Sequence, residues 1–487
     1  MDKTDLPALI SELSKILPAE GVLHSREDRA PYECDGLSAY RVLPMLVVIP
    51  ETVEQIVPIL SACASRKVPV VARGAGTGLS GGALPLENGV LLSLARFNQI
   101  VDINTEDRTA RVQPGVRNLA ISEAVAQYGL YYAPDPSSQI ACSIGGNVAE
   151  NAGGVHCLKY GLTVHNILKL EIITMAGEQL TIGSDALDSP GYDLLALMTG
   201  SEGLLGIITG VTVKLLPKPA ATKVLLISFD DVATAGQAVS DIIAQGIIPA
   251  GLELMDKACI RAADDFVKAG YPLDAAAILL CEVDGTVEEV NDQLQHTQDI
   301  LKHSGATEIR LAKDDQERLK FWAGRKSAFP AVGRLSPDYY CMDGTIPRHQ
   351  IANVLTQISR LSEKYQLPVV NVFHAGDGNL HPLILYDASI EGELERTEKL
   401  GGRILEICVE VGGTITGEHG VGVEKIDQMC IQFNSAELSQ FHAIKHAFDP
   451  DELLNPGKNI PTLHRCAEFG AMHVHHGKLP HPEIERF

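Results

Sequence analysis

Four glycine-rich segments between residues 73 and 209 constrain the fold more than any other feature of the sequence. The first, RGAGTGLSGG at residues 73–82, follows an apolar run typical of a β-strand. Glycine-dense turns let backbone N–H groups converge on a phosphate, because no Cβ blocks the approach. Gly76, Gly78 and Gly81 match the dinucleotide-binding fingerprint, but the residues 81–85 that follow, GGALP, cannot open the helix that this fingerprint requires. The segment therefore predicts a phosphate-binding loop outside a Rossmann fold.

The other three segments are PDPSS at 134–138, SIGGNVAENAGG at 143–154 and TGSEGLLGIIT at 199–209. Any one of them taken alone is more often a tight turn than a ligand loop. Four such segments in one region favour a shared ligand site, and we expect them to surround one nucleotide.

Hydrophobic periodicity divides the chain into two α+β regions. Apolar runs at 45–49 and 69–72 flank a helical pattern at 52–66, which predicts a β-α-β unit. The run Pro217-Lys218-Pro219 is typical of a domain boundary. Beyond it the pattern predicts strands at 224–228, 277–283, 308–311, 368–374 and 380–386, and helices at 231–244, 286–303, 314–330, 347–365, 391–411 and 435–447.

The charge balance excludes some classes of partner. The chain has 40 basic and 62 acidic residues, a net charge of −22, so a nucleic acid backbone would be repelled. Ten scattered cysteines form no CxxC pair, which argues against an iron–sulfur or zinc framework and indicates free thiols in a reducing compartment. The N-terminus lacks a signal-peptide pattern, and the longest apolar runs are too short for a membrane span. We therefore expect a soluble, cytoplasmic protein.

Two histidines and a Glu-His pair form the second chemical feature. His374 and His381 flank the turn AGDGNL, so a hairpin would bring both to the same end of a sheet. Glu418 and His419 lie in a second glycine-rich segment, residues 413–422. Two imidazoles and one carboxylate are a standard ligand set for a divalent metal with one open position. The alternative is that both histidines are core residues bonded to backbone carbonyls.

Taken together, RGAGTGLSGG, PDPSS, SIGGNVAENAGG and GSEGLLGIIT resemble the FAD-binding half of flavoproteins of the vanillyl-alcohol-oxidase, or p-cresol-methylhydroxylase (PCMH), type. From Pro31 onward the chain resembles the glycolate-oxidase group of the FAD-linked D-2-hydroxy-acid dehydrogenase family. The resemblance implies an α+β fold: a two-subdomain PCMH-type FAD-binding domain, then an α+β substrate (cap) domain with a ferredoxin-like antiparallel sheet, and a C-terminal segment that returns to the FAD domain. The expected boundaries are 1–40 for an N-terminal helical segment, 41–218 for the FAD-binding domain, 219–432 for the cap domain, 433–462 for the returning segment and 463–487 for a tail.

The resemblance also implies which residues hold FAD. Some relatives attach the flavin covalently to a histidine where this chain has Thr77, so we expect non-covalent binding. The residues that match the family's FAD loops are Arg73, Gly74, Ala75, Gly76, Thr77, Gly78, Ser80, Gly81, Pro134, Asp135, Ser138, Gly145, Gly146, Asn147, Asn151, Gly153, Gly154, Glu202, Gly203, Gly206, Ile208, Asn455 and Lys458.

Five residues carry the chemistry that the resemblance implies. His374, His381 and Glu418 align with metal ligands of zinc-dependent relatives, and His419 aligns with their proton-abstracting base. Arg325 matches the arginine that binds the substrate carboxylate. The implied reaction is oxidation of a small 2-hydroxy acid, with proton abstraction by His419 and hydride transfer to flavin N5. Relatives that act on dicarboxylic acids have a lysine where this chain has Cys341, which favours glycolate or D-lactate.

The reduced flavin needs an electron acceptor, and the family implies partners. In relatives a second flavin-type subunit and an iron–sulfur subunit complete the enzyme on the cytoplasmic face of the inner membrane. We interpret the histidine-rich tail, 463–487, as a docking segment for such a subunit rather than a metal site. Two alternatives stay open: a D-lactate or D-2-hydroxy-acid dehydrogenase that acts alone, and an inactive scaffold subunit that only carries flavin.

Overall fold

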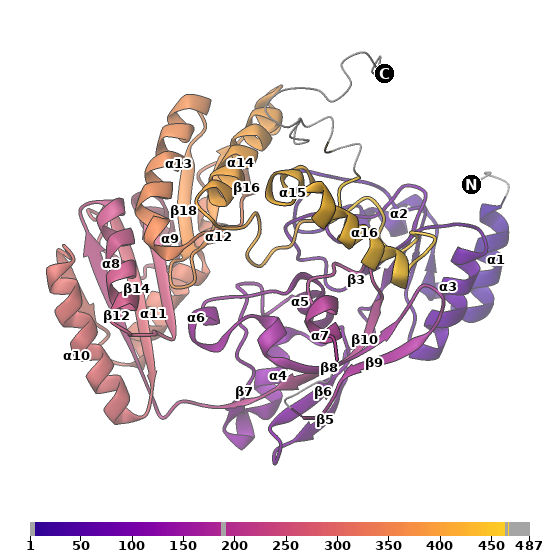
Figure 1. Cartoon of the computed structure of the whole chain (residues 1–487), viewed down its shortest axis with the longest axis horizontal. Helices are drawn as coiled ribbons and strands as arrows, with labels where there is room; N and C mark the ends of the chain where they lie inside the picture. Colours follow the sequence, from indigo (N-terminus) through magenta and orange to yellow (C-terminus); the bar gives the residue numbers. More distant parts are fainter. Residues whose placement is uncertain (1–4, 187–190, 463–465, 467–487) are drawn as a thin grey trace.

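The computed structural model describes residues 5–186, 191–462 and 466. Two α+β lobes lie side by side, the first drawn in indigo to magenta and the second in pink to orange (Figure 1). Helix α15 (Ile426–Gln432) packs against α14 (Glu393–Glu410) of the second lobe, and α16 (Ser435–Phe448) continues from it over the first lobe. The chain therefore crosses between the lobes twice.

The first lobe begins with a small sheet whose central strands are parallel. Its order is β1 (Val22–Leu23), β2 (Leu46–Val48), β4 (Val90–Ser93), β3 (Val70–Arg73), with β2, β4 and β3 parallel. Helices α1 (Leu6–Ile16) and α3 (Ile56–Ala64) bury their apolar faces against these strands. The predicted β-α-β unit is confirmed. The segment between β3 and β4 contains no helix. This agrees with the prediction that residues 81–85 cannot open the helix of a Rossmann fold.

A second, antiparallel sheet completes the first lobe. Its order is β5 (Ile100–Asn104), β6 (Thr109–Val112), β10 (Ile207–Lys214), β8 (Ile167–Ile173), β9 (Gln179–Gly183). Helix α4 (Asn118–Val125) contributes Ile121 and Val125 to the core of this sheet. The glycine-rich segments meet between the two sheets, because β3 and β10 both contribute residues to one cavity there.

One glycine-rich segment differs from the expected loop. Residues Ile144–Glu150 form a short helix, α5, although two of its first residues are Gly145 and Gly146. Ser143 caps it by accepting a hydrogen bond from the Gly146 N–H, and Asn151 ends it in the left-handed conformation, at φ 53°. Capping and burial thus override the low helix propensity of glycine.

The second lobe is built on a nine-stranded sheet in which every pair is antiparallel. Strand β12 (Ala221–Phe229) pairs with β15 (Glu308–Leu311) and β14 (Ala277–Gly285), and β13 (Gly251–Asp256) joins β14 to β18 (Val369–His374). The sheet is completed by β16 (Asp338–Cys341), β17 (Gly344–Thr345), β19 (Asn379–Leu380) and β20 (Pro382–Tyr386).

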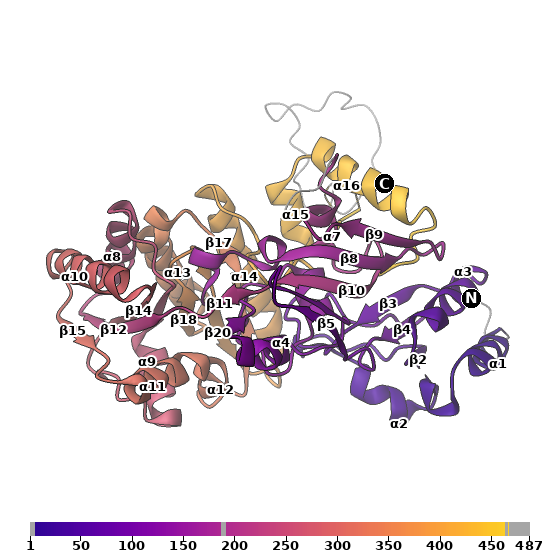
Figure 2. The same cartoon turned by 90° about the horizontal axis from the view of Figure 1, so that it is seen from below.

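Helices cover both faces of this sheet (Figures 1 and 2). Along β12, Leu225 and Ile227 join one buried cluster while Val224 and Leu226 join another, as the two-residue period of a strand requires. Helices α8 (Val232–Ala244), α10 (Val287–His303), α13 (Ile351–Tyr365) and α14 (Glu393–Glu410) belong to the first cluster, and α9 (Lys257–Val267), α11 (Asp315–Lys326) and α12 (Ala328–Val332) to the second.

The C-terminal segment returns to the first lobe, as the sequence predicted. Leu454 forms a parallel bridge with Val70 at the edge of the first sheet. The Asn455 side chain donates hydrogen bonds to the carbonyls of Gly82 and Glu202, at 2.9 and 2.7 Å. The C-terminal segment thereby joins two glycine-rich segments that lie far apart in the sequence, residues 73–82 and 199–209.

The cysteines depart in one respect from the prediction of free thiols throughout. Cys430 on α15 and Cys466 form a disulfide, while the other eight cysteines are free. No local spacing reveals this pair, because 36 residues separate its members. The rest of the tail that we expected to dock a partner, 463–465 and 467–487, lies outside the described residues.

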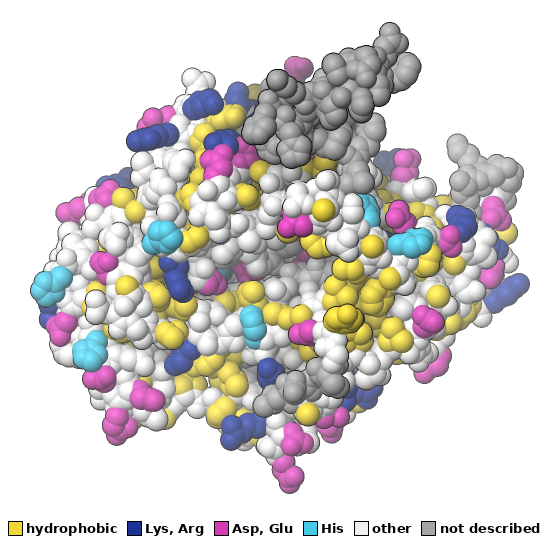
Figure 3. Space-filling view, viewed as in Figure 1, with side chains coloured by type: hydrophobic (Ala, Val, Ile, Leu, Met, Phe, Trp, Pro, Cys, Tyr) yellow, Lys and Arg dark blue, Asp and Glu magenta, His cyan; other side chains and the backbone are white. Residues whose placement is uncertain are grey.

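Two surface properties bear on the expected partners. No helix among residues 5–186 and 191–462 is both long and apolar enough to cross a membrane. Acidic and basic side chains are interspersed on the described part of the face in Figure 3, without a continuous basic surface there.

Candidate active site

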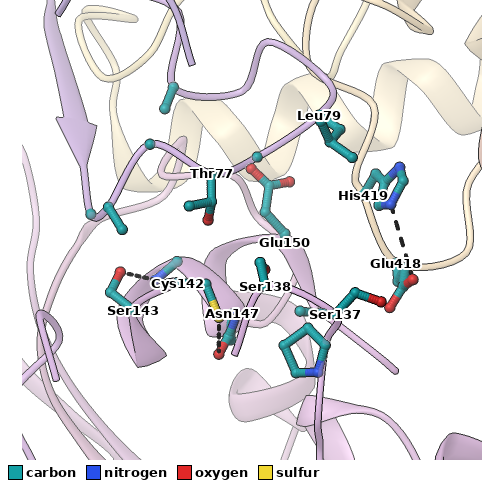
Figure 4. A pocket seen from close by; sticks show the side chains of 18 of the residues that line it. Thr77, Leu79, Ser137, Ser138, Cys142, Ser143, Asn147, Glu150, Glu418 and His419 are labelled. Atoms are coloured by element: carbon teal, nitrogen blue, oxygen red, sulfur yellow. Dashed lines mark hydrogen bonds and ion pairs between the residues drawn. The ribbon is translucent and has the colours of Figure 1, made fainter. Parts of the chain in front are cut away.

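The glycine-rich segments and the Glu-His pair enclose one cavity of about 330 Å³. Thr77 and Leu79 lie on one wall, and the segment from Ser137 to Asn147 forms the opposite wall (Figure 4). Glu418 and His419 close one end, on a segment that comes from the second lobe. The cavity therefore joins the expected FAD loops to the expected catalytic residues.

A smaller cavity, of about 70 Å³, continues the first one toward β10. The two share Gly74, Ala83, Gly146 and Glu150, so together they form one elongated space between the sheets. The sequence-predicted residues that line it are Arg73, Gly74, Ala75, Gly76, Thr77, Gly78, Ser138, Gly145, Gly146, Asn147, Glu202, Gly203, Gly206 and Ile208.

Other predicted FAD residues line neither cavity but support the loops. Lys458 donates to the carbonyl of Gly82, at 3.0 Å, and Asn151 accepts from the Val164 N–H. The Asp135 carboxylate lies 3.0 Å from the ring of His156. Ser80, Gly81, Pro134 and Asn455 are also absent from both linings, whereas Gly153 and Gly154 line a separate cavity of about 250 Å³ that reaches His374 and Glu418.

Glycine is required in the first loop for steric reasons. Gly76 has φ +70°, and a Cβ there would lie 2.2 Å from the Arg73 guanidinium. We expect Gly76→Val to purify colourless, because the loop cannot close around a phosphate once Arg73 is displaced. Gly129→Val is the matched control: its φ is +68°, but nothing lies within 4 Å of the added Cβ. Full flavin absorbance in Gly76→Val would contradict this role.

The structure brings together four of the five residues that the sequence assigned to the chemistry: His374, His381, Glu418 and His419. His374 ends β18 and His381 lies between β19 and β20, so the predicted hairpin places both side chains against Glu418. Oε1 of Glu418 lies 3.3 Å from Nε2 of His374, 3.2 Å from Nε2 of His381 and 4.0 Å from Nε2 of His419. These side chains form one cluster where the two lobes meet.

His374 is held by a second carboxylate that the sequence analysis missed. Its Nδ1 lies 2.8 Å from Oε1 of Glu253, a buried residue of β13. Nη2 of Arg325 lies 2.6 Å from the other oxygen of Glu253. Arg325, expected to meet the substrate directly, is 1% exposed and does not line the cavity. Within the part of the chain that the structure describes, its ion pair with Glu253 connects it to His374.

His419 has the properties of a neutral base. Its ring stacks on that of His381, with centroids 4.9 Å apart and planes within 4° of parallel. Burial, reinforced by the neighbouring His381, lowers the pKa of His419 to about 4. Its Nδ1 has no hydrogen-bond partner within the described part of the chain. An unprotonated imidazole at the cavity end can accept a proton at neutral pH.

Asp343 is the central polar residue that the sequence analysis missed. This fully buried carboxylate accepts hydrogen bonds from the N–H groups of Gly417, Glu418 and His419, at 3.0, 3.1 and 2.9 Å. It also accepts 2.7 Å from Asn379 of the hairpin. A single side chain thus fixes the Glu-His segment against the histidine hairpin.

Other residues that sequence reasoning did not assign also line the cavity. They include Glu150 at the end of α5, and Lys326, Phe329 and Pro330 from α11 and α12. The carboxylate of Glu150, within a glycine- and alanine-rich segment, was a signal that the sequence did offer.

Comparison with known proteins identifies the family. Residues 44–183 match the FAD binding domain family, and residues 218–459 match the family described as FAD linked oxidases, C-terminal domain. The chain is 69% identical over 483 residues to the glycolate oxidase subunit GlcD of Escherichia coli K12, covering 99% of this chain and 97% of that one. It is 41% identical to GlcD of Bacillus subtilis (92% and 95% covered) and 31% identical to a D-lactate dehydrogenase of Anaerostipes hadrus (93% and 97% covered).

Solved structures support the same fold. A p-cresol methylhydroxylase structure superimposes with a TM-score of 0.81, covering 95% of this chain and 98% of that chain at 18% identity. An alkyldihydroxyacetonephosphate synthase gives 0.73, covering 93% and 86% at 17% identity. The expected PCMH-type FAD-binding domain followed by an α+β cap domain is confirmed. The chain therefore belongs to the FAD-linked oxidase family, and it is an FAD-binding oxidoreductase.

Proposed function

We propose that the chain oxidises glycolate to glyoxylate and passes the electrons to partner subunits. The observation that carries this is the cavity itself, which runs from the FAD loops to a neutral histidine beside a cluster of metal-binding type. The 69% identical relative is named as a glycolate oxidase subunit, which supports glycolate as the acid.

The chain's residues fit a divalent metal. Four ligands at about 2.0 Å around a tetrahedral zinc lie about 3.3 Å from one another. The Glu418 oxygen lies 3.3 and 3.2 Å from the ligating nitrogens of His374 and His381. Neither nitrogen of His381 has a hydrogen bond of normal geometry within the described residues. The Glu253 contact to the other nitrogen of His374 is the support that metal-bound histidines usually have. We propose that His374, His381 and Glu418 hold zinc or a similar cation.

The chain's own groups would divide the reaction as follows. His419 takes the proton of the substrate hydroxyl, since burial keeps its ring neutral. FAD, when bound, supplies the acceptor for the hydride from the substrate Cα at its N5. A metal, when bound, lowers the pKa of the hydroxyl. Glu253 and Asp343 keep the imidazoles and Glu418 in place.

FAD would be held by the predicted loop residues that line the elongated cavity, without a covalent bond because Thr77 replaces a histidine. The described residues contain no iron–sulfur ligand set, so the electrons must leave the chain. We propose a second flavin-type subunit and an iron–sulfur subunit as partners, on the cytoplasmic face of the inner membrane. The name "subunit" carried by the relatives supports such a complex.

Oxidation of D-lactate is the second candidate, because several relatives are named D-lactate dehydrogenases. A scaffold that only carries flavin is disfavoured, since it would not need a neutral, half-buried histidine beside a cluster of metal-binding type.

Anaerobic titration of the purified, FAD-loaded chain tests the function. We expect glycolate to bleach the flavin absorbance near 450 nm, on the order of one equivalent per flavin, faster than D-lactate does. Removal of metal with a chelator should abolish bleaching, and Zn²⁺ or Mn²⁺ should restore it. Preferential bleaching by D-lactate would favour the second candidate, and no bleaching by either acid would favour the scaffold. Bleaching that persists after complete metal removal would refute the metal site.

A further inference from the structure

Both lobes line the larger cavity. The first lobe contributes residues 136–138 among others, and the second lobe contributes Lys326 and residues 329–330, where α11 ends and α12 begins. A substrate that binds between the lobes needs these two sides at a fixed separation, because a small misplacement of binding groups is costly. A contact that ties the two sides together would therefore govern how well the site closes.

His156 makes such a contact. It precedes the short helix α6 (Cys157–Tyr160), which lies between the lobes in Figure 1. Its Nδ1 lies 3.0 Å from Oδ1 of Asp135, beside residues 136–138, and its Nε2 lies 3.1 Å from Oε1 of Glu282, in β14 of the second lobe. A neutral imidazole has one N–H and can donate to only one carboxylate, so the two contacts together require an imidazolium. Burial lowers the pKa of His156, but Asp135 and then Glu282 raise it to about 10.

Glu282 carries the contact onward to α11. Its Oε2 accepts a hydrogen bond from Nε1 of Trp322, at 2.6 Å, and lies 3.6 Å from Nη1 of Arg318. Trp322 and Arg318 both belong to α11, the helix whose last residue lines the cavity. The ring of Trp322 lies 6.3 Å from that of His156, centroid to centroid. One imidazolium thus connects the two sides of the cavity, the first through Asp135 and the second through Glu282 and α11.

The residues that follow His156 bind the same strand of the second lobe. The Tyr160 hydroxyl donates to the carboxylate of Asp284 in β14, at 2.7 Å. The ammonium of Lys159 donates to the Asp284 carbonyl, also at 2.7 Å. These contacts hold α6 against β14, and His156 extends them to the first-lobe side of the cavity.

We propose that His156 is a positioning residue that holds the two sides of the cavity at the separation that substrate binding needs. Its effect on the reaction rests on the proposed oxidation of a 2-hydroxy acid, whereas the contact between the lobes does not. Without the cation, the carboxylates of Asp135 and Glu282 would repel each other across the gap between the lobes. The fraction of molecules with a closed cavity would fall, which weakens substrate binding by the same factor and leaves the saturated complex unchanged.

The test compares His156→Gln and His156→Arg with a matched control, His296→Gln. Glutamine cannot donate hydrogen bonds from two opposite ends, whereas arginine keeps a permanent charge and several donors. His296 lies on the exposed side of α10, and its ring lies 3.7 Å from a single carboxylate, that of Asp292. Each FAD-loaded chain is assayed for kcat and KM with glycolate. The flavin absorbance change gives the dissociation constant of oxalate, an acid with no C–H from which hydride could leave.

Trp322 provides a measurement that does not depend on catalysis. It is the single tryptophan of the chain, it is 6% exposed, and its Nε1 donates to Glu282. Its fluorescence emission should shift to longer wavelength in His156→Gln, as water reaches the indole. The emission should stay at the wild-type wavelength in His156→Arg and in His296→Gln.

We expect His156→Gln to raise the KM for glycolate and the dissociation constant of oxalate about tenfold, the usual effect of losing a hydrogen bond to a charged group. The kcat should change little, because saturating glycolate closes the cavity again. His156→Arg should recover most of the lost affinity, and His296→Gln should behave as wild type. Damage to the catalytic residues would instead lower kcat, and loss of FAD would appear in the flavin absorbance.

Wild-type KM and oxalate constants in His156→Gln would overturn the proposal, as would an arginine variant no better than the glutamine variant. Should His156→Gln not fold, Glu282→Gln keeps an oxygen for Trp322 but removes one charge from the bridge, and normal constants there would also overturn the proposal. If neither glycolate nor D-lactate reduces the flavin, the proposed oxidation fails while oxalate binding and Trp322 emission still test His156. An unshifted Trp322 emission in His156→Gln would then refute the contact itself.

Discussion

Replacement of His419 by alanine or glutamine is expected to slow flavin reduction by glycolate at least ~10²-fold, the typical loss when a general base is removed. The ring is the only group at the cavity end that is both neutral and unbonded at Nδ1 within the described residues. Stopped-flow absorbance under anaerobic conditions measures the rate directly.

The same variants should keep FAD and the proposed metal, because His419 lies 4.0 Å from the Glu418 oxygen that meets the other two histidines. His303→Ala, on the exposed face of α10, is the control and should reduce at the normal rate. A reduction rate near that of wild type in His419→Ala would remove His419 from the proton transfer.

Replacement of Asp343 by alanine is expected to destabilise the chain by about 3–5 kcal/mol, the usual effect of removing one partner from a buried charged network. Three backbone N–H groups of the Glu-His segment would lose their acceptor, and the buried ammonium of Lys425, 3.5 Å away, would lose one of its carboxylates. Denaturant unfolding measures the stability, and metal analysis measures the site.

Asp343→Asn tests the same contacts without a cavity. We expect it to fold, because the amide keeps one acceptor oxygen, but to lose most of its metal and its flavin reduction as the Glu-His segment moves. Asp338→Asn, at the start of the strand that leads to Asp343 but outside the site, should retain both. A fully metallated, active Asp343→Asn chain would show that the segment holds its position without the charge.

Much of this site was predictable because the signals were local. The hairpin of His374 and His381 follows from two apolar runs around a Gly-Asp-Gly-Asn turn. The glycine-rich loops can be recognised from their composition alone. Their convergence on one cavity came from the family resemblance, since no local rule brings residues 74 and 418 together.

The residues that support the site were missed because their partners are distant in sequence. Glu253 is a single carboxylate within the apolar strand β13, and Asp343 lies in the short connection between β16 and β17; 121 and 76 residues separate them from His374 and His419. A charge inside a buried strand is a signal that a partner exists, but the sequence does not say which one. Strand β13 and helix α9 were not predicted at all.

Which of Arg325 and Lys326 faces the cavity depends on the rotation of α11 about its axis, which the sequence alone does not define. Both are cations in the last turn of α11, and a rotation of the helix by one residue would exchange their places. The packing of Phe321 and Trp322 into the second-lobe core fixes that rotation. Tertiary packing thus decides which cation faces the cavity.

The tie made by Asn455 between Gly82 and Glu202 has a consequence for biosynthesis. Ribosomes deliver the chain from its amino end, so the glycine loops emerge long before the residue that fastens them. Until then a nascent polypeptide cannot complete its nucleotide cradle, however much dinucleotide surrounds it. A chain cut short before Asn455 would therefore lack the tie between the two loops, and it is expected to purify without flavin.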